Sequence, residues 1–120
     1  MLTCDFFIVR EAFSIKTYYY LHKRRSYMKY VVNTIWKHPN DINWDNMREG
    51  LERLRDDEGS AEEVTWYEID SKTHGSVAVY SSEENYESYK SKLEEYRKDA
   101  TDEIGAVIEH EFKGNVKANL

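Results

Sequence analysis

The fold of this 120-residue chain is decided by the stretch Lys29-Tyr30-Val31-Val32-Asn33-Thr34-Ile35-Trp36. It is rich in β-branched and aromatic residues and is closed by His38-Pro39-Asn40, and both properties predict a strand. Successive side chains of a strand alternate between its faces, so Asn33 shares a face with Val31 and Ile35. We assign that face to the core, where the Asn33 amide is either a hydrogen-bonded structural group or a group that faces a cavity.

A helix is predicted after this strand. Trp44, Met47, Leu51 and Leu54 recur at spacings of three and four, which places them in one apolar stripe along a helix. Asn43 comes directly before the stripe and is the expected N-cap, because its side-chain oxygen can accept hydrogen bonds from the first turn.

A hairpin follows the helix. Residues 64–70 and 76–80 are both rich in β-branched and aromatic residues and predict two strands. Residues 71–75 between them form the expected turn, in which Gly75 is free to take a positive φ.

A second helix is predicted after the hairpin. Ser81-Ser82-Glu83-Glu84 fits the capping-box pattern that starts many helices. Tyr86, Tyr89, Leu93 and Tyr96 then form one stripe, which we expect to face the sheet.

The last predicted element is a strand over residues 106–112. Alternation there places Ile108, His110 and Phe112 on one face. His110 is therefore either a hydrogen-bonded core histidine or a base in a pocket.

This succession over residues 29–112 is the ferredoxin-like βαββαβ order, an α+β fold. Its four-stranded antiparallel sheet carries both helices on one face and has no cover on the other. With Val31, Asn33 and Ile35 toward the helices, the uncovered face carries the remaining large residues of the first strand, which are Tyr30, Val32, Thr34 and Trp36. A patch of that size favours a partner, and two sheets packed face to face predict a homodimer.

The length of the chain suits one domain with a core of its own, which we predict at residues 28–112, followed by a tail at 113–120. Residues 1–27 differ from this body. They are either an N-terminal arm, which packs its aromatics on the body or on a partner, or an extended start ahead of Met28.

Charge and cysteine content argue against several classes of function. The formal net charge is −6, and the body beyond residue 27 is acidic, so binding to nucleic-acid phosphates is not expected. Cys4 is the single cysteine, so an intrachain disulfide cannot form. With neither a secretory signal nor a run of about 20 apolar residues, we expect a cytoplasmic protein that does not bind membranes.

In the order and length of its elements the chain resembles the dimeric α+β barrel superfamily, which includes antibiotic-biosynthesis monooxygenase-like and haem-degrading domains. The resemblance rests on the 29–36 strand, the 44–54 helix, the hairpin about Gly75, the 86–96 helix and the 108–112 strand. It implies a homodimer with a small-molecule pocket between the sheet and the helices of each subunit.

An aromatic and amide set supplies candidate residues for such a pocket. Rings with a few polar tips suit an apolar or aromatic organic ligand. The candidate ligand-binding residues are Asn33, Trp44, Tyr67, Tyr86, Tyr89, Tyr96 and His110. The alternative is that these aromatics fill the core.

Three functions follow as expectations. The first is binding of an apolar or aromatic small organic molecule. The second, implied by the resemblance, is a cofactor-independent monooxygenase or isomerase, in which Asn33 would hydrogen-bond the substrate anion and His110 would take the proton. The third is a dimeric interaction module without a pocket. The sequence leaves open whether the chain is an enzyme.

No cofactor is expected. The haem-degrading branch of the superfamily uses an Asn on the first strand, which Asn33 matches, with a Trp and a His on the second helix, and residues 82–100 contain neither. A metal site at His110 is also not expected, because alternation sends Glu109 and Glu111 to the opposite face of the strand. The remaining histidines of the body, His38 and His74, are assigned to surface turns.

Overall fold

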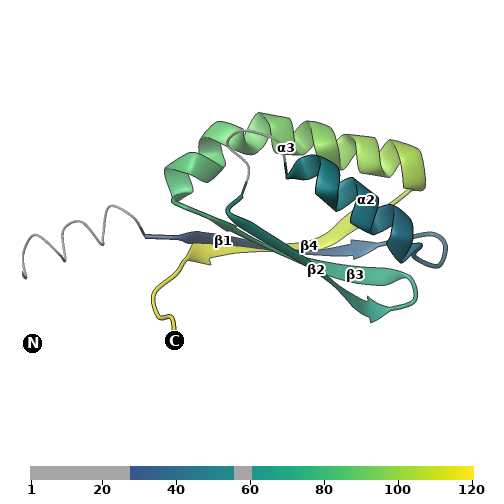
Figure 1. Cartoon of the computed structure of the whole chain (residues 1–120), viewed down its shortest axis with the longest axis horizontal. Coiled ribbons are helices and arrows are strands. Elements are labelled where there is room, and N and C mark those ends of the chain that lie inside the picture. Colours follow the sequence, from purple (N-terminus) through teal and green to yellow (C-terminus); the bar gives the residue numbers. More distant parts are fainter. Residues whose placement is uncertain (1–27, 56–60) are drawn as a thin grey trace, which may run out of the picture.

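A computed structural model describes residues 28–55 and 61–120 of the chain. The elements in order are β1 (Tyr30–Lys37), α2 (Trp44–Leu54), β2 (Glu63–Asp70), β3 (Thr73–Tyr80), α3 (Glu83–Ile104) and β4 (Val107–Asn115) (Figure 1). The predicted βαββαβ order is therefore confirmed. The predicted arm at residues 1–27 lies outside the described residues.

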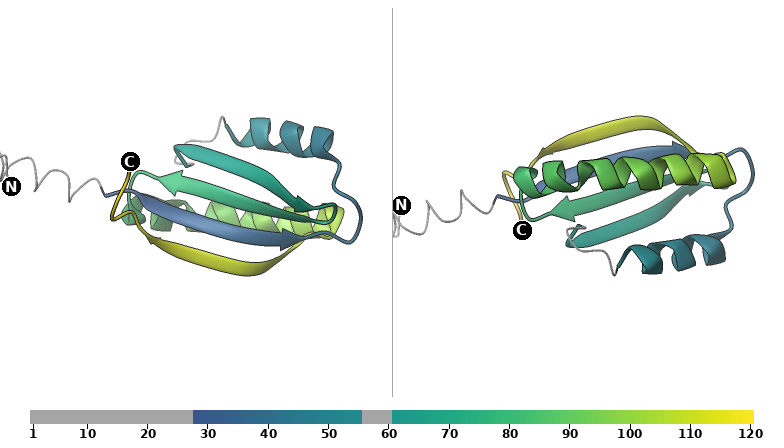
Figure 2. Two further views of the ribbon diagram at one scale, coloured as in Figure 1. Left: turned by 90° about the horizontal axis from the view of Figure 1, so that it is seen from below. Right: turned by 90° about the horizontal axis from the view of Figure 1, so that it is seen from above.

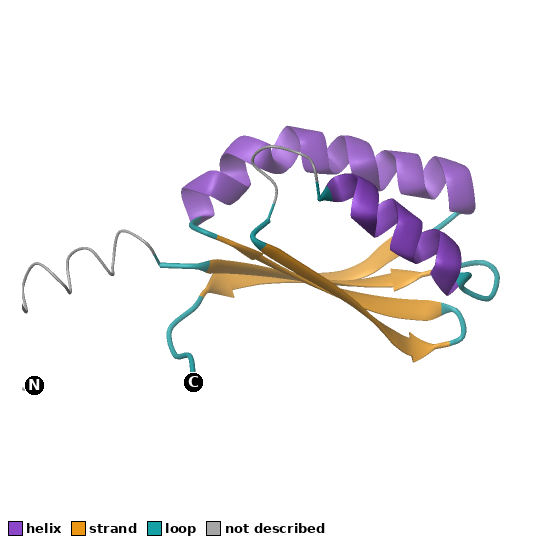
Figure 3. Cartoon of the chain, viewed as in Figure 1, coloured by secondary structure: helices purple, strands orange, loops and turns teal. Residues whose placement is uncertain are grey.

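The four strands form one antiparallel sheet in the order β2-β3-β1-β4, as expected for the ferredoxin-like fold. Both helices lie on the same side of the sheet (Figure 3). They do not share that side equally: α3 lies over the middle of the sheet, whereas α2 lies beside the β2 edge (Figure 2). The core of the domain is therefore formed mainly between α3 and the sheet.

The face of β1 that packs on α3 is the one that carries Tyr30 and Val32. Both are buried in a cluster with Tyr80 of β3 and with Tyr86 and Tyr89 of α3. The Tyr30 and Tyr86 ring centroids are 5.3 Å apart, and those of Tyr80 and Tyr86 are 5.2 Å apart in an edge-to-face arrangement. The tyrosine stripe of α3 thus faces the sheet, as predicted.

The predicted orientation of β1 is wrong, because Val31, Asn33 and Ile35 face away from the helices. We term the side of the sheet that they occupy the open face. Cross-strand pairing shows that the open face contains three rows of residues. They are Glu63, Val79, Val31 and Gly114; Thr65, Val77, Asn33 and Phe112; and Tyr67, Gly75, Ile35 and His110. Both faces of β1 are largely apolar. Alternation in the sequence therefore assigns each residue of β1 to one of two faces, but it does not show which face packs on the helices.

Gly75 also differs from its predicted role. The hairpin turn is Ser71–Lys72, and Gly75 lies within β3 opposite Tyr67. A Cβ atom at position 75 would collide with the Tyr67 ring, so the glycine is required by close packing and not by a positive φ. Gly105, with φ of 73°, is the positive-φ glycine of the described part of the chain, and it ends α3.

A bulge in β4 changes the predicted alternation of that strand. Ile35 pairs with His110 and Trp36 pairs with Ile108, so the register shifts at Glu109. One extra residue reverses the direction of the side chains beyond it. Ile108 therefore lies on the helix side of the sheet, while His110 lies on the open face.

Candidate functional site

The seven predicted ligand-binding residues lie in three separate places. Tyr86, Tyr89 and Tyr96 belong to the packing between α3 and the sheet. Asn33, Tyr67 and His110 lie on the open face, and Trp44 lies at the start of α2. Because the sheet separates Asn33 and His110 from the α3 tyrosines, the described chain does not bring these seven residues into one pocket.

The α3 tyrosines fill space in the core. Tyr86 has no exposed surface, and its hydroxyl lies 3.5 Å from Nζ of Lys113, which also lies 5.4 Å from the centre of the Tyr86 ring. Burial raises the pKa of the neighbouring Tyr80 to about 12, so that hydroxyl stays protonated at neutral pH. The α3 tyrosines therefore act as packing groups of the core.

The open face is apolar at its centre, with one unsatisfied polar atom. Phe112 is 63% exposed there and is stacked on His110, with ring centroids 6.2 Å apart. Between Val77 and Phe112 lies Asn33, whose Oδ1 is buried without a hydrogen-bond partner. An amide oxygen in this state costs about 1–3 kcal/mol unless a partner reaches it.

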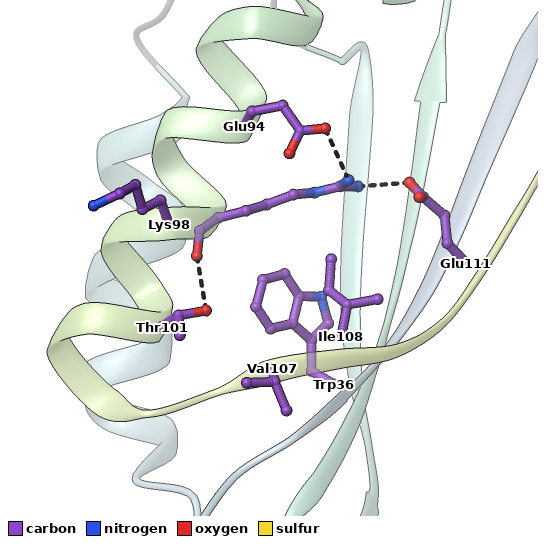
Figure 4. Close-up of a pocket in the computed structure, with 8 residues that line it drawn as sticks. Trp36, Glu94, Lys98, Thr101, Val107, Ile108 and Glu111 are labelled. Atoms are coloured by element: carbon purple, nitrogen blue, oxygen red, sulfur yellow. Dashed lines mark hydrogen bonds and ion pairs between the residues drawn. The ribbon is translucent and has the colours of Figure 1, made fainter.

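A groove of about 390 Å³ opens between the second half of α3 and the neighbouring strands, and we term it the Trp36 groove. Its lining consists of Trp36, Glu94, Arg97, Lys98, Thr101, Val107, Ile108 and Glu111 (Figure 4). The indole of Trp36 and the side chain of Ile108 lie next to each other, as their pairing across β1 and β4 requires (Figure 4). The groove thus combines one aromatic ring, aliphatic side chains and several charges.

The charged side of the groove is built around Arg97. Its guanidinium contacts Oε2 of Glu111 at 3.0 Å and Oε2 of Glu94 at 3.8 Å. The Arg97 side chain is only 14% exposed, so water screens these contacts less than ordinary surface ion pairs. The Thr101 side chain, one turn further along α3, is held in place because its hydroxyl donates a hydrogen bond to the carbonyl of Ala106 at 2.7 Å.

Trp36 also belongs to a histidine–tryptophan cluster, which adjoins the groove. The cluster consists of Trp36, His38, Trp44, Trp66 and His74. The rings of Trp36 and His74 are stacked with centroids 5.9 Å apart and planes 8° apart. Trp66 and Trp44 contact His74 from other directions, at 5.6 and 6.2 Å. All three tryptophans of the chain therefore surround one imidazole.

The two histidines of this cluster are buried, so their assignment to surface turns is wrong. His74 is 4% exposed and His38 is 6% exposed, and Nε2 of His38 lies 2.8 Å from Nδ1 of His74, where one nitrogen donates to the other. Burial, and secondarily the nearby His38, lower the pKa of His74 to about 4. Burial also lowers the pKa of His38. Both rings are therefore neutral at pH 7.

The sequence carried a usable signal for part of this site. Arg97 lies four residues after Leu93, so helical spacing puts it on the inward stripe of α3. The burial of His74 had no comparable local signal, because it depends on the register that pairs His74 with Trp36.

Comparisons of the chain with protein-family models, with curated proteins and with solved structures found no match. Within residues 28–55 and 61–120, no helix is long and apolar enough to cross a membrane. The same residues contain no group of three or more histidine, cysteine or acidic side chains placed to hold a metal ion.

Proposed function

We propose that this protein is a homodimer that binds a small organic molecule with an apolar or aromatic part in the Trp36 groove. The observation that carries the proposal is the position of the Trp36 ring, which lines the groove and is stacked on buried His74. The groove is open to solvent, and its volume of about 390 Å³ lies at the small end of the range of small-molecule sites. The groove lies between a helix and the sheet, which is where the superfamily that the sequence resembles has its pocket.

Trp36 is held in place before any ligand arrives. Its Nε1 donates a hydrogen bond to Oγ1 of buried Thr34 at 3.0 Å, and its ring is stacked on His74. A ring that is already ordered loses little conformational entropy when a ligand stacks on it. This rigidity supports a binding role for the indole in addition to its packing role.

The binding proposal is tested by titration of the full chain with three phenyl compounds of similar size, which are phenethylamine, phenethyl alcohol and phenylacetate. We expect at least one of them to shift the NMR signal of the Trp36 indole N–H in a saturable way. Val107→Phe fills the groove from an exposed position and should weaken that binding about fivefold, as expected for steric loss of a contact surface.

The matched control is Ile104→Phe, which adds a ring at an equally exposed residue that does not line the groove. It should leave affinity within about twofold, a difference too small to reflect a lost contact. If none of the three compounds shifts the Trp36 signal at concentrations up to about 20 mM, the binding proposal is wrong.

The open face supports the homodimer. The two rows that contain Asn33 and Ile35 carry no Asp, Glu, Lys or Arg. The whole open face, four strands about 4.8 Å apart and about eight residues long, spans about 19 by 26 Å, or about 500 Å² as a flat area. Side-chain relief increases this area, so the roughly 800 Å² per partner of a standard interface requires nearly the whole face. A second copy offers the same uncharged surface, and its Asn33 amide could supply the hydrogen bond that Oδ1 of Asn33 lacks.

Val77→Asp is expected to convert the dimer into a monomer, because it would bury a carboxylate beside the unsatisfied amide of Asn33. Native mass spectrometry and light scattering at the same protein concentration measure the change, and circular dichroism checks that the variant is folded. Ile104→Asp, a charge added at an exposed position on α3, should leave the dimer intact. A wild-type chain that is monomeric at micromolar concentration would contradict the dimer.

A further inference from the structure

We propose that the ligand of the Trp36 groove is an organic cation, such as an amine attached to an apolar or aromatic body. This inference rests on the proposed binding function and assigns the chemical class of the ligand. It comes from the balance of charges in the groove, from the negative charge and dipole of α3, and from the half-buried Trp36 ring that lines the groove.

The groove has more carboxylates than free cations to neutralise them. Glu94 and Glu111 share the single guanidinium of Arg97. The other cation of the lining, Lys98, is already paired with Asp102 at 3.1 Å. Lys113, outside the lining, also acts on Glu111 electrostatically, but its Nζ lies at the Tyr86 hydroxyl, 3.5 Å away. The two glutamates thus share one guanidinium inside the groove, and a ligand ammonium group beside Glu111 would add a second cation there.

The helix that forms one wall adds to this negative potential. α3 carries eight acidic and four basic side chains, a net charge of −4, and has no basic residue in its last turn. Glu94, Arg97, Lys98 and Thr101, which line the groove, belong to the C-terminal half of α3, and Thr101 lies in its last turn, at the negative end of the helix dipole. A cation in the groove is attracted by both contributions, and an anion is repelled by both.

Trp36 supplies the surface on which such a cation would lie. The face of an indole attracts cations more strongly than that of any other protein side chain, and the interaction strengthens when water is partly excluded. A ligand that combines a ring or alkyl part with an ammonium group would contact Ile108 with its body and place its charge between the Trp36 ring and Glu111 (Figure 4).

Binding of an anion would require Arg97 to give up one of its present partners. Its side chain is 14% exposed and contacts two carboxylates, so a ligand carboxylate would have to displace Glu94 or Glu111. The displaced glutamate would then lie in a negative environment without its partner. The Arg97 guanidinium is therefore already occupied by two carboxylates and is not a free anion-binding group.

The test compares phenethylamine, phenethyl alcohol and phenylacetate, which differ mainly in charge, by NMR titration of the Trp36 indole N–H in the full chain. Phenethylamine should bind about tenfold more tightly than the alcohol, and phenylacetate more weakly than both. The preference for the amine should shrink as salt is raised, because exposed charges are screened.

Glu111→Gln should weaken the amine about tenfold and leave the alcohol within about twofold. Glu94→Gln, at a more exposed position, should act in the same direction and provides a second test if the first variant is unstable. Glu103→Gln is the control, since it removes a charge from α3 outside the groove and should change affinity by no more than about twofold.

The outcomes separate the two proposals. If the alcohol or the acid binds at Trp36 as tightly as the amine, the cation inference is overturned and the binding function stands. If no compound binds, both are overturned. If the amine binds most tightly but Glu111→Gln and Glu94→Gln leave its affinity unchanged, the assignment of the charge to these carboxylates is wrong.

Discussion

Tyr86→Ala is expected to lower the free energy of unfolding by about 3–5 kcal/mol, the range observed when a large buried ring is truncated. Tyr86 is the largest side chain with no exposed surface in the described part of the chain. Its ring contacts those of Tyr30 and Tyr80 from two sides, so its removal leaves a cavity at the centre of the α3–sheet packing. A domain of this size has a total stability of about 5–15 kcal/mol, so the loss is a large fraction of it.

Chemical denaturation of the wild type and the variant at one protein concentration measures this loss, because the proposed dimer would make stability depend on concentration. Tyr86→Phe keeps the ring and removes only the hydroxyl beside Lys113, so it should cost about 1 kcal/mol. Glu87→Ala, at the exposed neighbouring position, should change stability by less than about 0.5 kcal/mol. A cost below about 1.5 kcal/mol for Tyr86→Ala would show that Tyr86 is not central to the core.

Much of the fold could be predicted because its signals are local. Asn43 accepts hydrogen bonds from the N–H groups of Asp45 and Asn46, and Gly105 ends α3 in the left-handed region. Both features depend on a few neighbouring residues and can be read from the sequence. The stripe that contains Tyr86 and Tyr89 likewise follows from helical spacing alone.

The orientation of the strands could not be predicted in the same way. β1 has Tyr30 and Val32 on one face and Val31 and Ile35 on the other, and both sets are apolar enough for a core. The choice is made by tertiary packing, since Tyr30 fits against Tyr86 of α3. This single reversal moved Asn33 from the expected pocket to the open face.

The Trp36 groove depends on two further features that are not local. The bulge at Glu109 turns Ile108 toward the helix side, and no turn residue or proline marks it in the sequence. The approach of Arg97 to Glu111 brings together residues of α3 and β4. The groove therefore depends on tertiary contacts that local sequence patterns do not contain, and ligand binding between the sheet and the helix stays a prediction.

Acidification from pH 7 to pH 4.5 is expected to lower the free energy of unfolding by about 2–3 kcal/mol through His74 alone. In the unfolded chain His74 titrates near its ordinary pKa of 6.5, whereas in the folded protein its pKa is about 4. Below pH 6.5 the unfolded state therefore binds a proton that the folded state does not. The stabilisation is complete above pH 6.5 and is lost as the pH falls toward 4.

Other groups near the cluster do not reverse this sign. The pKa of His38 is also lowered by burial, so its titration adds to the loss in the same direction. Glu68, which pairs across the strands with His74, accepts a hydrogen bond from Nε1 of Trp44 at 2.8 Å. Asp70 has a lowered pKa, caused chiefly by the backbone N–H of Lys72, so its contribution is lost only at lower pH.

The measurement is denaturation of the full chain at pH 7 and pH 4.5, followed by tryptophan fluorescence, because every tryptophan contacts His74. His74→Gln should be less stable at pH 7 but should lose less than half as much stability on acidification as the wild type. Lys92→Gln, at an exposed position of α3 away from the cluster, should lose as much as the wild type. Equal acid losses in the wild type and in His74→Gln would mean that the buried histidine pair does not control stability between pH 7 and pH 4.5. The position of Trp36 in the groove would then not depend on the protonation of His74.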